Sequence, residues 1–411
     1  LPFVGVGWYR TEFDVPQFQA GKRATILFDG AMSHANVYIN GQKVGYWPYG
    51  YNSFHFDITK YLKPGEKNTL AVRLENLPES SRWYPGAGLY RNVHLIITED
   101  AYIPVWGTYI TTPSVNEKFA KVNVRTKVVL PEGADPAKYS VETSVWNPNK
   151  QKLTAVRTSL AQMKYNNNQA EQEFVIQAPS LWSPEMPALY SAETRLYEGD
   201  KLKDIYTTPF GIRSIEIIPD KGFFLNGKRT VFKGVCNHHD LGPLGAAVND
   251  AAIRRQIRIL KDMGCNAIRT SHNMPAPELI RACDEMGMMI MAESFDEWNV
   301  AKCKNGYNLL FDEWAEKDLV NLLHNFRNNP SVVMWCIGNE VPNQWNEGDC
   351  KIAKWLQDIC HREDPTRPVT QGMDAPDAVV NNNFAAVMDV AGFNYRPFKY
   401  KINYKKLPQR I

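Results

Sequence analysis

The second half of the chain alternates short apolar segments with amphipathic ones, and this alternation restricts the possible folds more than any other feature. Residues 267–272, 288–293 and 332–340 are strand-like, whereas residues 250–263 place apolar side chains at helical spacing. Strands that alternate with helices pair in parallel, because each helix carries the chain back to the same end of the sheet. No G-x-G-x-x-G motif follows any of these strands, so the pattern favours a TIM barrel over a dinucleotide-binding fold.

Six predicted strands can be counted in this region, whereas a closed TIM barrel has eight. The six strands begin near Val231, Ala267, Met288, Val332, Pro368 and Val387. Residues 396–411, which follow the sixth strand, are too few for two further strand–helix units. We therefore expect residues 213–411 to form an incomplete TIM barrel with about six of the eight strands.

Residues 1–212 lack this alternation and consist of short strand-like segments separated by turns. Asn40-Gly41 and Pro64-Gly65 are typical turn dipeptides between alternating apolar and polar segments. Many short strands joined by turns are typical of β-sandwiches. We predict a multidomain chain, with a jelly-roll β-sandwich over residues 1–100 and an immunoglobulin-like β-sandwich over residues 101–212.

Composition excludes several classes of function. The net charge of +3 is too small to indicate binding to nucleic acid or to an anionic membrane, and no apolar stretch approaches the length of a membrane span. Seven cysteines without a C-x-x-C motif indicate neither a zinc site nor a disulfide framework. Aromatic residues make up 12% of the chain, which suits stacking on sugars and suits the filling of sandwich cores equally well.

Polar side chains end five of the six predicted strands of the barrel. In a TIM barrel the functional residues lie at these carboxyl ends. The candidates are His238, His239, Asp240, Arg269, His272, Glu293, Asn339, Glu340 and Tyr395, with Trp298 in the loop after the third strand. Each has a structural alternative: the histidines could lie satisfied in the core, Arg269 could pair with Glu293, and Trp298 could pack under a loop.

Two carboxylates and several aromatic rings around one pocket suggest glycoside hydrolysis. In this chemistry one carboxylic acid protonates the departing oxygen, while a second carboxylate attacks the anomeric carbon or activates water. Glu340, at the end of an apolar strand, is our candidate for the acid. Asn339 is placed to bond a sugar hydroxyl, and Arg269 to hold a neighbouring carboxylate ionised.

Several segments together resemble glycoside hydrolase family two, in particular its β-galactosidase branch. They are residues 8–10 (WYR), 82–93 (RWYPGAGLYRNV), 210–213 (FGIR), 234–240 (GVCNHHD), 269–273 (RTSHN) and 338–340 (GNE). The resemblance covers essentially the whole chain in order. It implies a retaining double displacement on terminal β-D-galactosides, with Glu340 as the acid/base and Asn339 at the 2-hydroxyl. It also implies a galactose pocket with His238, His239, Asp240 and His272, the nucleophile flanked by Arg269 and Tyr395, and Trp298 and Tyr395 as sugar contacts.

The resemblance places the nucleophile on a glutamate at the end of a seventh strand. No Asp or Glu follows Asp389, so we expect the 411 residues to lack the nucleophile and to have little activity alone. Some family members bind magnesium near the acid/base, and Glu297 could be one ligand. Position 299 carries Asn where a histidine ligand would be expected, so the sequence does not support a magnesium or sodium ion, and we assign no cofactor.

The resemblance implies an oligosaccharide or β-galactoside as the partner, with neither nucleic acid nor membrane, and it is compatible with a homo-oligomer. It favours a periplasmic or secreted bacterial protein over a cytoplasmic one. Two alternatives stay open: a β-glucuronidase or β-mannosidase on the same scaffold, and a non-catalytic carbohydrate-binding protein.

Overall fold

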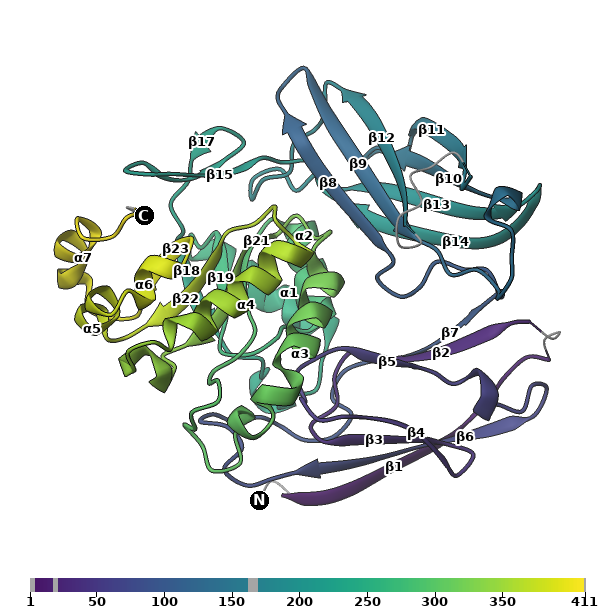
Figure 1. Cartoon of the computed structure of the whole chain (residues 1–411), viewed down its shortest axis with the longest axis horizontal. Helices are drawn as coiled ribbons and strands as arrows, with labels where there is room; N and C mark the ends of the chain where they lie inside the picture. Colours follow the sequence, from purple (N-terminus) through teal and green to yellow (C-terminus); the bar gives the residue numbers. More distant parts are fainter. Residues whose placement is uncertain (1–3, 18–20, 162–168, 410–411) are drawn as a thin grey trace.

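The computed structural model describes residues 4–17, 21–161 and 169–409, and these form two β-sandwiches packed against a β/α unit (Figure 1). The β/α unit lies on the left of Figure 1, with the first sandwich at the lower right and the second at the upper right. The predicted fold class, a jelly roll, an immunoglobulin-like sandwich and an incomplete barrel, is confirmed. The residue at which each domain ends stays a prediction.

The first sandwich consists of two antiparallel sheets, with strand orders β1-β6-β3-β4 and β5-β2-β7. Its strands are β1 (Gly5–Asp14), β2 (Arg23–Phe28), β3 (Ala35–Ile39), β4 (Gln42–Trp47), β5 (Phe54–Asp57), β6 (Lys67–Asn76) and β7 (Val93–Thr98). Alternate residues point into the shared core, as in β3, where Val37 is buried between half-buried neighbours. Asn40 and Gly41 both have positive φ, which the tight turn between β3 and β4 requires.

The second sandwich packs a four-stranded sheet, β11-β10-β13-β14, on a three-stranded sheet, β12-β9-β8. This division of seven strands into four and three matches a constant-type immunoglobulin sandwich. Its strands are β8 (Thr108–Val115), β9 (Phe119–Lys127), β10 (Tyr139–Trp146), β11 (Lys152–Ser159), β12 (Gln169–Gln177), β13 (Tyr190–Glu198) and β14 (Lys201–Phe210). A small antiparallel sheet that the sequence analysis did not predict follows, formed by β15 (Ile215–Ile218), β16 (Gly222–Leu225) and β17 (Lys228–Arg229).

The β/α unit contains one parallel sheet of six strands in sequence order, as predicted. The strands are β18 (Gly234–Asn237), β19 (Ala267–Thr270), β20 (Met289–Glu293), β21 (Val332–Asn339), β22 (Val369–Met373) and β23 (Val390–Phe393). The helices are α1 (Asp250–Asp262), α2 (Pro277–Met286), α3 (Phe311–Phe326), α4 (Cys350–Glu363), α5 (Pro376–Asn381), α6 (Phe384–Val387) and α7 (Pro397–Tyr404). Among the described residues no helix is both long enough and apolar enough to span a membrane.

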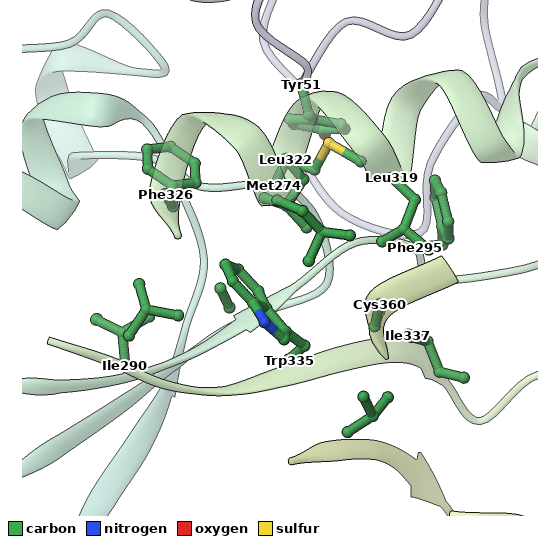
Figure 2. Close-up of a cluster of buried hydrophobic side chains, with 14 of the residues drawn as sticks. Tyr51, Met274, Ile290, Phe295, Leu319, Leu322, Phe326, Trp335, Ile337 and Cys360 are labelled. Atoms are coloured by element: carbon green, nitrogen blue, oxygen red, sulfur yellow. The ribbon is translucent and has the colours of Figure 1, made fainter. Parts of the chain in front are cut away.

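The core of the β/α unit lies between the sheet and its helices (Figure 2). Ile290, Trp335 and Ile337 from the strands belong to one buried cluster with Leu319 and Leu322 of α3. Tyrosines of the first sandwich extend this cluster, as the labelled side chain of Tyr51 in Figure 2 shows. The first sandwich and the β/α unit, which is the incomplete barrel, therefore share a continuous apolar interior rather than a loose interface.

Buried aspartates also fix both sandwiches to the barrel. Asp318 on α3 is fully buried and accepts hydrogen bonds from Trp47 (2.9 Å) and Asn52 (2.7 Å) of the first sandwich. Asp364, also fully buried, accepts one from the Tyr109 hydroxyl of the second sandwich at 2.7 Å. A buried carboxylate is costly unless several donors satisfy it, so each domain interface is specific in geometry.

The pKa of Asp318 makes the stability of the interface between the first sandwich and the barrel depend on pH in a predictable direction. Burial raises the pKa of Asp318 to about 6, although the hydrogen bonds from Tyr307, Asn52 and Trp47 lower it. An unfolded aspartate has a pKa of about 4. Between these two values the folded protein binds more protons than the unfolded chain, so this group's contribution to stability decreases as the pH rises.

We expect Asp318→Asn to remove this contribution, because an amide does not titrate. Between pH 4 and pH 7 the wild-type group should lose up to about 3 kcal/mol of its contribution. The midpoint of thermal unfolding should therefore depend less on pH in Asp318→Asn than in the wild type. Asp358→Asn, in an exposed ion pair on α4, is the control. Identical pH profiles for the wild type and Asp318→Asn would contradict the raised pKa.

Candidate active site

A fully buried carboxylate, Glu293, lies at the centre of the carboxyl-terminal edge of the parallel sheet. It ends β20 and accepts two hydrogen bonds from Arg269, at the end of β19, with Nε–Oε2 of 2.5 Å and Nη2–Oε1 of 3.1 Å. His272 Nδ1 lies 3.0 Å from Glu293 Oε1. Burial alone would lower the pKa of Arg269, but the Glu293 carboxylate raises it above its usual range, so the guanidinium stays charged.

Two asparagine side chains extend this ion pair to Glu340. Arg269 Nη2 donates to Asn339 Oδ1 (3.0 Å), and Arg269 Nη1 donates to Asn394 Oδ1 (3.1 Å). Asn394 Nδ2 in turn donates to Asn339 Oδ1 (2.8 Å) and to Glu340 Oε1 (2.9 Å). Asn394 was not selected from the sequence, because its role depends on contacts between three different strands.

The backbone conformation of Glu340 and the lack of a side chain at Gly372 both allow this network of hydrogen bonds. Glu340 has a φ of 45°, a left-handed conformation that costs a non-glycine residue about 1–3 kcal/mol and is commonly retained at functional sites. Its N–H donates to the Gly372 carbonyl at 2.7 Å. A Cβ added at Gly372 would lie 2.5 Å from Arg269 Nη2, so only glycine at this position of β22 leaves room for the guanidinium.

A second carboxylate, Asp296, joins the barrel to the first sandwich beside Asn339. Arg82, from the loop after β6, donates to both of its oxygens at 2.8 and 2.6 Å. Lys302 Nζ and Asn339 Nδ2 each donate to Asp296 Oδ1 at 3.0 Å. Burial would raise the pKa of Asp296, but the hydrogen bond from Arg82 and the charge of Lys302 lower it to about 2. None of Arg82, Asp296 and Lys302 was selected as a site residue from the sequence, although Asp296 follows the third predicted strand.

The predicted histidines separate into two groups. His272 and His238 have ring centroids 5.7 Å apart, and Trp83 of the first sandwich lies 5.2 Å from His238 and 5.9 Å from His272. These three rings form one wall next to Glu293. Burial, followed by the charge of His272, lowers the pKa of His238. Asp240 follows in the chain and is half-buried.

His239 belongs to the domain interface. Its Nε2 lies 3.0 Å from the Pro85 carbonyl, and its ring packs on Tyr51 and Tyr90 of the first sandwich. Burial lowers the pKa of His239 to about 4, so the ring is neutral at physiological pH. A neutral imidazole that donates to a backbone carbonyl anchors the 81–90 loop, and contact of His239 with a sugar stays a prediction.

Trp298 and Tyr395 have opposite environments. Trp298 is fully buried, donates from Nε1 to the Ile337 carbonyl at 2.9 Å and stacks on Phe384. The prediction of Trp298 as a sugar contact is therefore wrong, because the indole lies in the core beneath the third-strand loop. Tyr395, just after β23, is 69% exposed and remains available to a ligand.

The magnesium position that the resemblance suggested does not fit the residues present. The Glu297 carboxylate accepts hydrogen bonds from the backbone N–H groups of Lys302, Cys303 and Asn308. The Asn299 side-chain oxygen accepts one from Asn343 at 2.9 Å. Glu297 therefore holds the 302–308 loop in place, and no group of three or more His, Cys, Asp or Glu side chains suited to a metal occurs in the part of the chain that the structure describes.

A cleft next to this site lies between the first sandwich and the barrel. Its walls come from Tyr49 and Trp83 on the sandwich side and from His272, Asp296 and Tyr307 on the barrel side. Aromatic rings together with a few polar groups are typical of a site for a small polar ligand. The first sandwich thus contributes directly to the surface around the carboxylates.

Comparisons with known proteins agree with this architecture. Models described as glycosyl hydrolases family 2 match the chain over residues 3–99 (sugar binding domain), 102–213 and 216–404 (TIM barrel domain). "Beta-galactosidase BoGH2A" from Bacteroides ovatus is 41% identical over 95% of this chain and 50% of its own length. "Beta-glucuronidase" from Bacteroides fragilis is 32% identical, covering 89% of this chain and 54% of its own length.

A solved structure of a glycosyl hydrolase family 2 member from Bacteroides cellulosilyticus superimposes with a TM-score of 0.93 at 37% identity. The match covers 99% of this chain and 52% of that one. The chain therefore spans about half the length of the relatives that it matches.

The buried pair of Glu293 and Arg269 leads to a prediction about stability. Arg269→Met should destabilise the barrel by about 3–5 kcal/mol, because it leaves a buried carboxylate without its cation. Adding Glu293→Gln to that variant should recover part of the loss. Lys354→Met, at an exposed ion pair on α4, should cost less than about 1 kcal/mol. Thermal unfolding measures all three, and equal effects of Arg269→Met and Lys354→Met would contradict the role of the buried pair.

Proposed function

The chain belongs to glycosyl hydrolase family 2, and from this premise we propose that it provides the sugar pocket and the acid/base carboxylate of a retaining glycosidase for terminal β-D-galactosides. The observation that carries this proposal is the placement of Glu340. It follows Asn339 at the end of a parallel strand, and Asn394 holds one of its two carboxyl oxygens.

Glu340 acts as the acid in the first step and as the base in the second. It protonates the glycosidic oxygen while a carboxylate attacks the anomeric carbon, and it then takes a proton from the water that releases the sugar. Among the described residues, Oε1 is the one Glu340 side-chain oxygen with a hydrogen bond, which leaves Oε2 to carry the proton. The hydrogen bond from Asn394 fixes the orientation of the carboxyl group in both steps.

Glu293 has a positioning role and is not the nucleophile. Both of its oxygens are engaged by Arg269 and one also by His272, and the side chain is fully buried. A carboxylate held in this way cannot approach an anomeric carbon without losing its ion pair. The glutamate at the end of a seventh strand, to which the resemblance assigns the attack, is not among the six parallel strands of the described residues and stays a prediction.

Sequence similarity supports a galactoside over a glucuronide as the substrate. The identity to the relative named as a β-galactosidase is 41%, whereas it is 36% to one named "Putative beta-glucuronidase" and 32% to one named "Beta-glucuronidase".

Hydrolysis of nitrophenyl glycosides by the natural gene product that carries this chain tests the substrate class. We expect kcat/KM for the β-D-galactoside to exceed that for the β-D-glucuronide and the β-D-mannoside at least about tenfold, since a well-placed polar pocket discriminates by 1.4 kcal/mol or more. A preference for the glucuronide would contradict the proposed substrate and would instead indicate a β-glucuronidase. Binding of galactose without hydrolysis of any glycoside would instead favour a carbohydrate-binding protein.

The acid/base role predicts a dependence on the leaving group. Glu340→Gln should lower kcat/KM for an alkyl galactoside about 10²- to 10⁴-fold, because the departing alkoxide needs the proton. The loss should be much smaller for a dinitrophenyl galactoside, whose leaving group needs little protonation. Glu347→Gln, an exposed glutamate in the following loop, is the matched control and should leave both rates unchanged. A loss that is equal for both leaving groups would contradict the role as acid.

A further inference from the structure

We infer that Arg82, a residue of the first sandwich, is a positioning residue for the amide of Asn339 and acts through Asp296; the inference rests on the proposed function. The connection consists of two direct contacts. Arg82 holds both oxygens of Asp296 at 2.8 and 2.6 Å, and Asp296 Oδ1 accepts the hydrogen bond from Asn339 Nδ2 at 3.0 Å. Such a two-point contact between a guanidinium and a carboxylate fixes orientation as well as distance.

Asp296 determines the direction of the N–H groups of the Asn339 amide. Its Oδ1 already accepts hydrogen bonds from Arg269 and Asn394. Its Nδ2 has two N–H groups, and among the described contacts one of them donates to Asp296. The other N–H is then directed away from Asp296 and has no hydrogen bond among the described contacts; Asn339 is 1% exposed, and the resemblance assigns it to the 2-hydroxyl of the sugar. The direction of this second N–H is therefore set by Asp296, and the position of Asp296 is set by Arg82.

Lys302 also holds the Asp296 carboxylate, but it cannot fix the orientation of that carboxylate as Arg82 does. Its ammonium donates to Asp296 Oδ1 at 3.0 Å and to the Asn339 carbonyl at 2.5 Å. An ammonium is a single point of charge, whereas Asp296 Oδ2 is held by Arg82. Without Arg82, Asp296 could rotate around its contact with Lys302, and Asn339 Nδ2 would lose a fixed acceptor.

Domain attachment does not need Arg82, because many other contacts join the first sandwich to the barrel. The buried Asp318 accepts hydrogen bonds from Trp47 and Asn52, and the buried Arg91 donates to the carbonyls of Met274 and Pro275. The Arg82 side chain is instead 38% exposed, and the Lys302 ammonium stays paired with Asp296 when Arg82 is replaced. Its effect should therefore be on the site rather than on the fold.

The first arm of the test compares Arg82→Gln, Arg82→Lys and Arg73→Gln in the natural gene product. Arg73 forms a similar ion pair with Glu75 on the same sandwich and serves as the matched control. Arg82→Gln should lower kcat/KM for a nitrophenyl galactoside about 10- to 100-fold, with most of the loss in kcat. Arg82→Lys should lose less, and Arg73→Gln should match the wild type. The unfolding midpoint of all three should shift by less than about 3 °C.

The second arm removes the sugar hydroxyl instead of the side chain. The resemblance assigns Asn339 to the 2-hydroxyl, so a 2-deoxygalactoside cannot use the amide. If Arg82 acts through Asn339, the loss on removing the 2-hydroxyl should be at least about fivefold smaller in Arg82→Gln than in the wild type. Losses of equal size in both proteins would overturn the inference, because they would mean that Arg82 acts on something else.

Crystal structures of the wild type and of Arg82→Gln form the third arm and do not depend on activity. The inference expects Asp296 and the Asn339 amide to change position or to become disordered in Arg82→Gln. Unchanged side chains would overturn it. If the wild type hydrolyses no glycoside but Asn339 still shifts in the variant, the proposed function fails while the positioning role stands, so the two failures can be distinguished.

Discussion

The organisation of the site depends on one buried charge, the carboxylate of Glu293. A charged group without solvent contact is tolerated only when a counter-charge and hydrogen bonds satisfy it, and Arg269 and His272 supply both. The same guanidinium then bonds the oxygens of Asn339 and Asn394. The cost of burying Glu293 thus fixes the ends of four strands relative to one another, and the position of Glu340 follows from them.

The two sandwiches are integral parts of this arrangement. The first sandwich shares its aromatic core with the barrel and contributes Trp83 to the wall beside His238 and His272. The second sandwich is attached through Asp364 and through Trp182, which donates to the Asp284 carbonyl. The surface around the carboxylates therefore depends on how the sandwiches are docked, as well as on the barrel strands.

The sequence allowed much of this fold to be predicted, because periodicity reports directly on secondary structure. The six parallel strands, the two sandwiches and the clustering of Arg269, Asn339 and Glu340 at strand ends all follow from local patterns. The small sheet formed by β15 to β17 was missed because its strands are only two to four residues long. Trp298 was misassigned because a loop position does not reveal which way a side chain packs.

The contacts that were missed join residues far apart in the chain. Arg82 and Asp296 are separated by 214 positions, and Asn394 lies 125 positions from Arg269. No local pattern could have paired them, although Arg82 lies within the segment of residues 82–93 that carries the family resemblance. In such a site the residues that touch a ligand can be located from strand ends, whereas the residues that orient them require the folded structure.

If Glu340 is the acid/base of a retaining glycosidase, azide should restore turnover to a variant that lacks its carboxyl group. In Glu340→Ala the second step lacks a base, but azide attacks without needing one. Added azide should therefore accelerate turnover of dinitrophenyl β-galactoside by this variant and yield β-galactosyl azide. No acceleration, or formation of the α-azide, would contradict it.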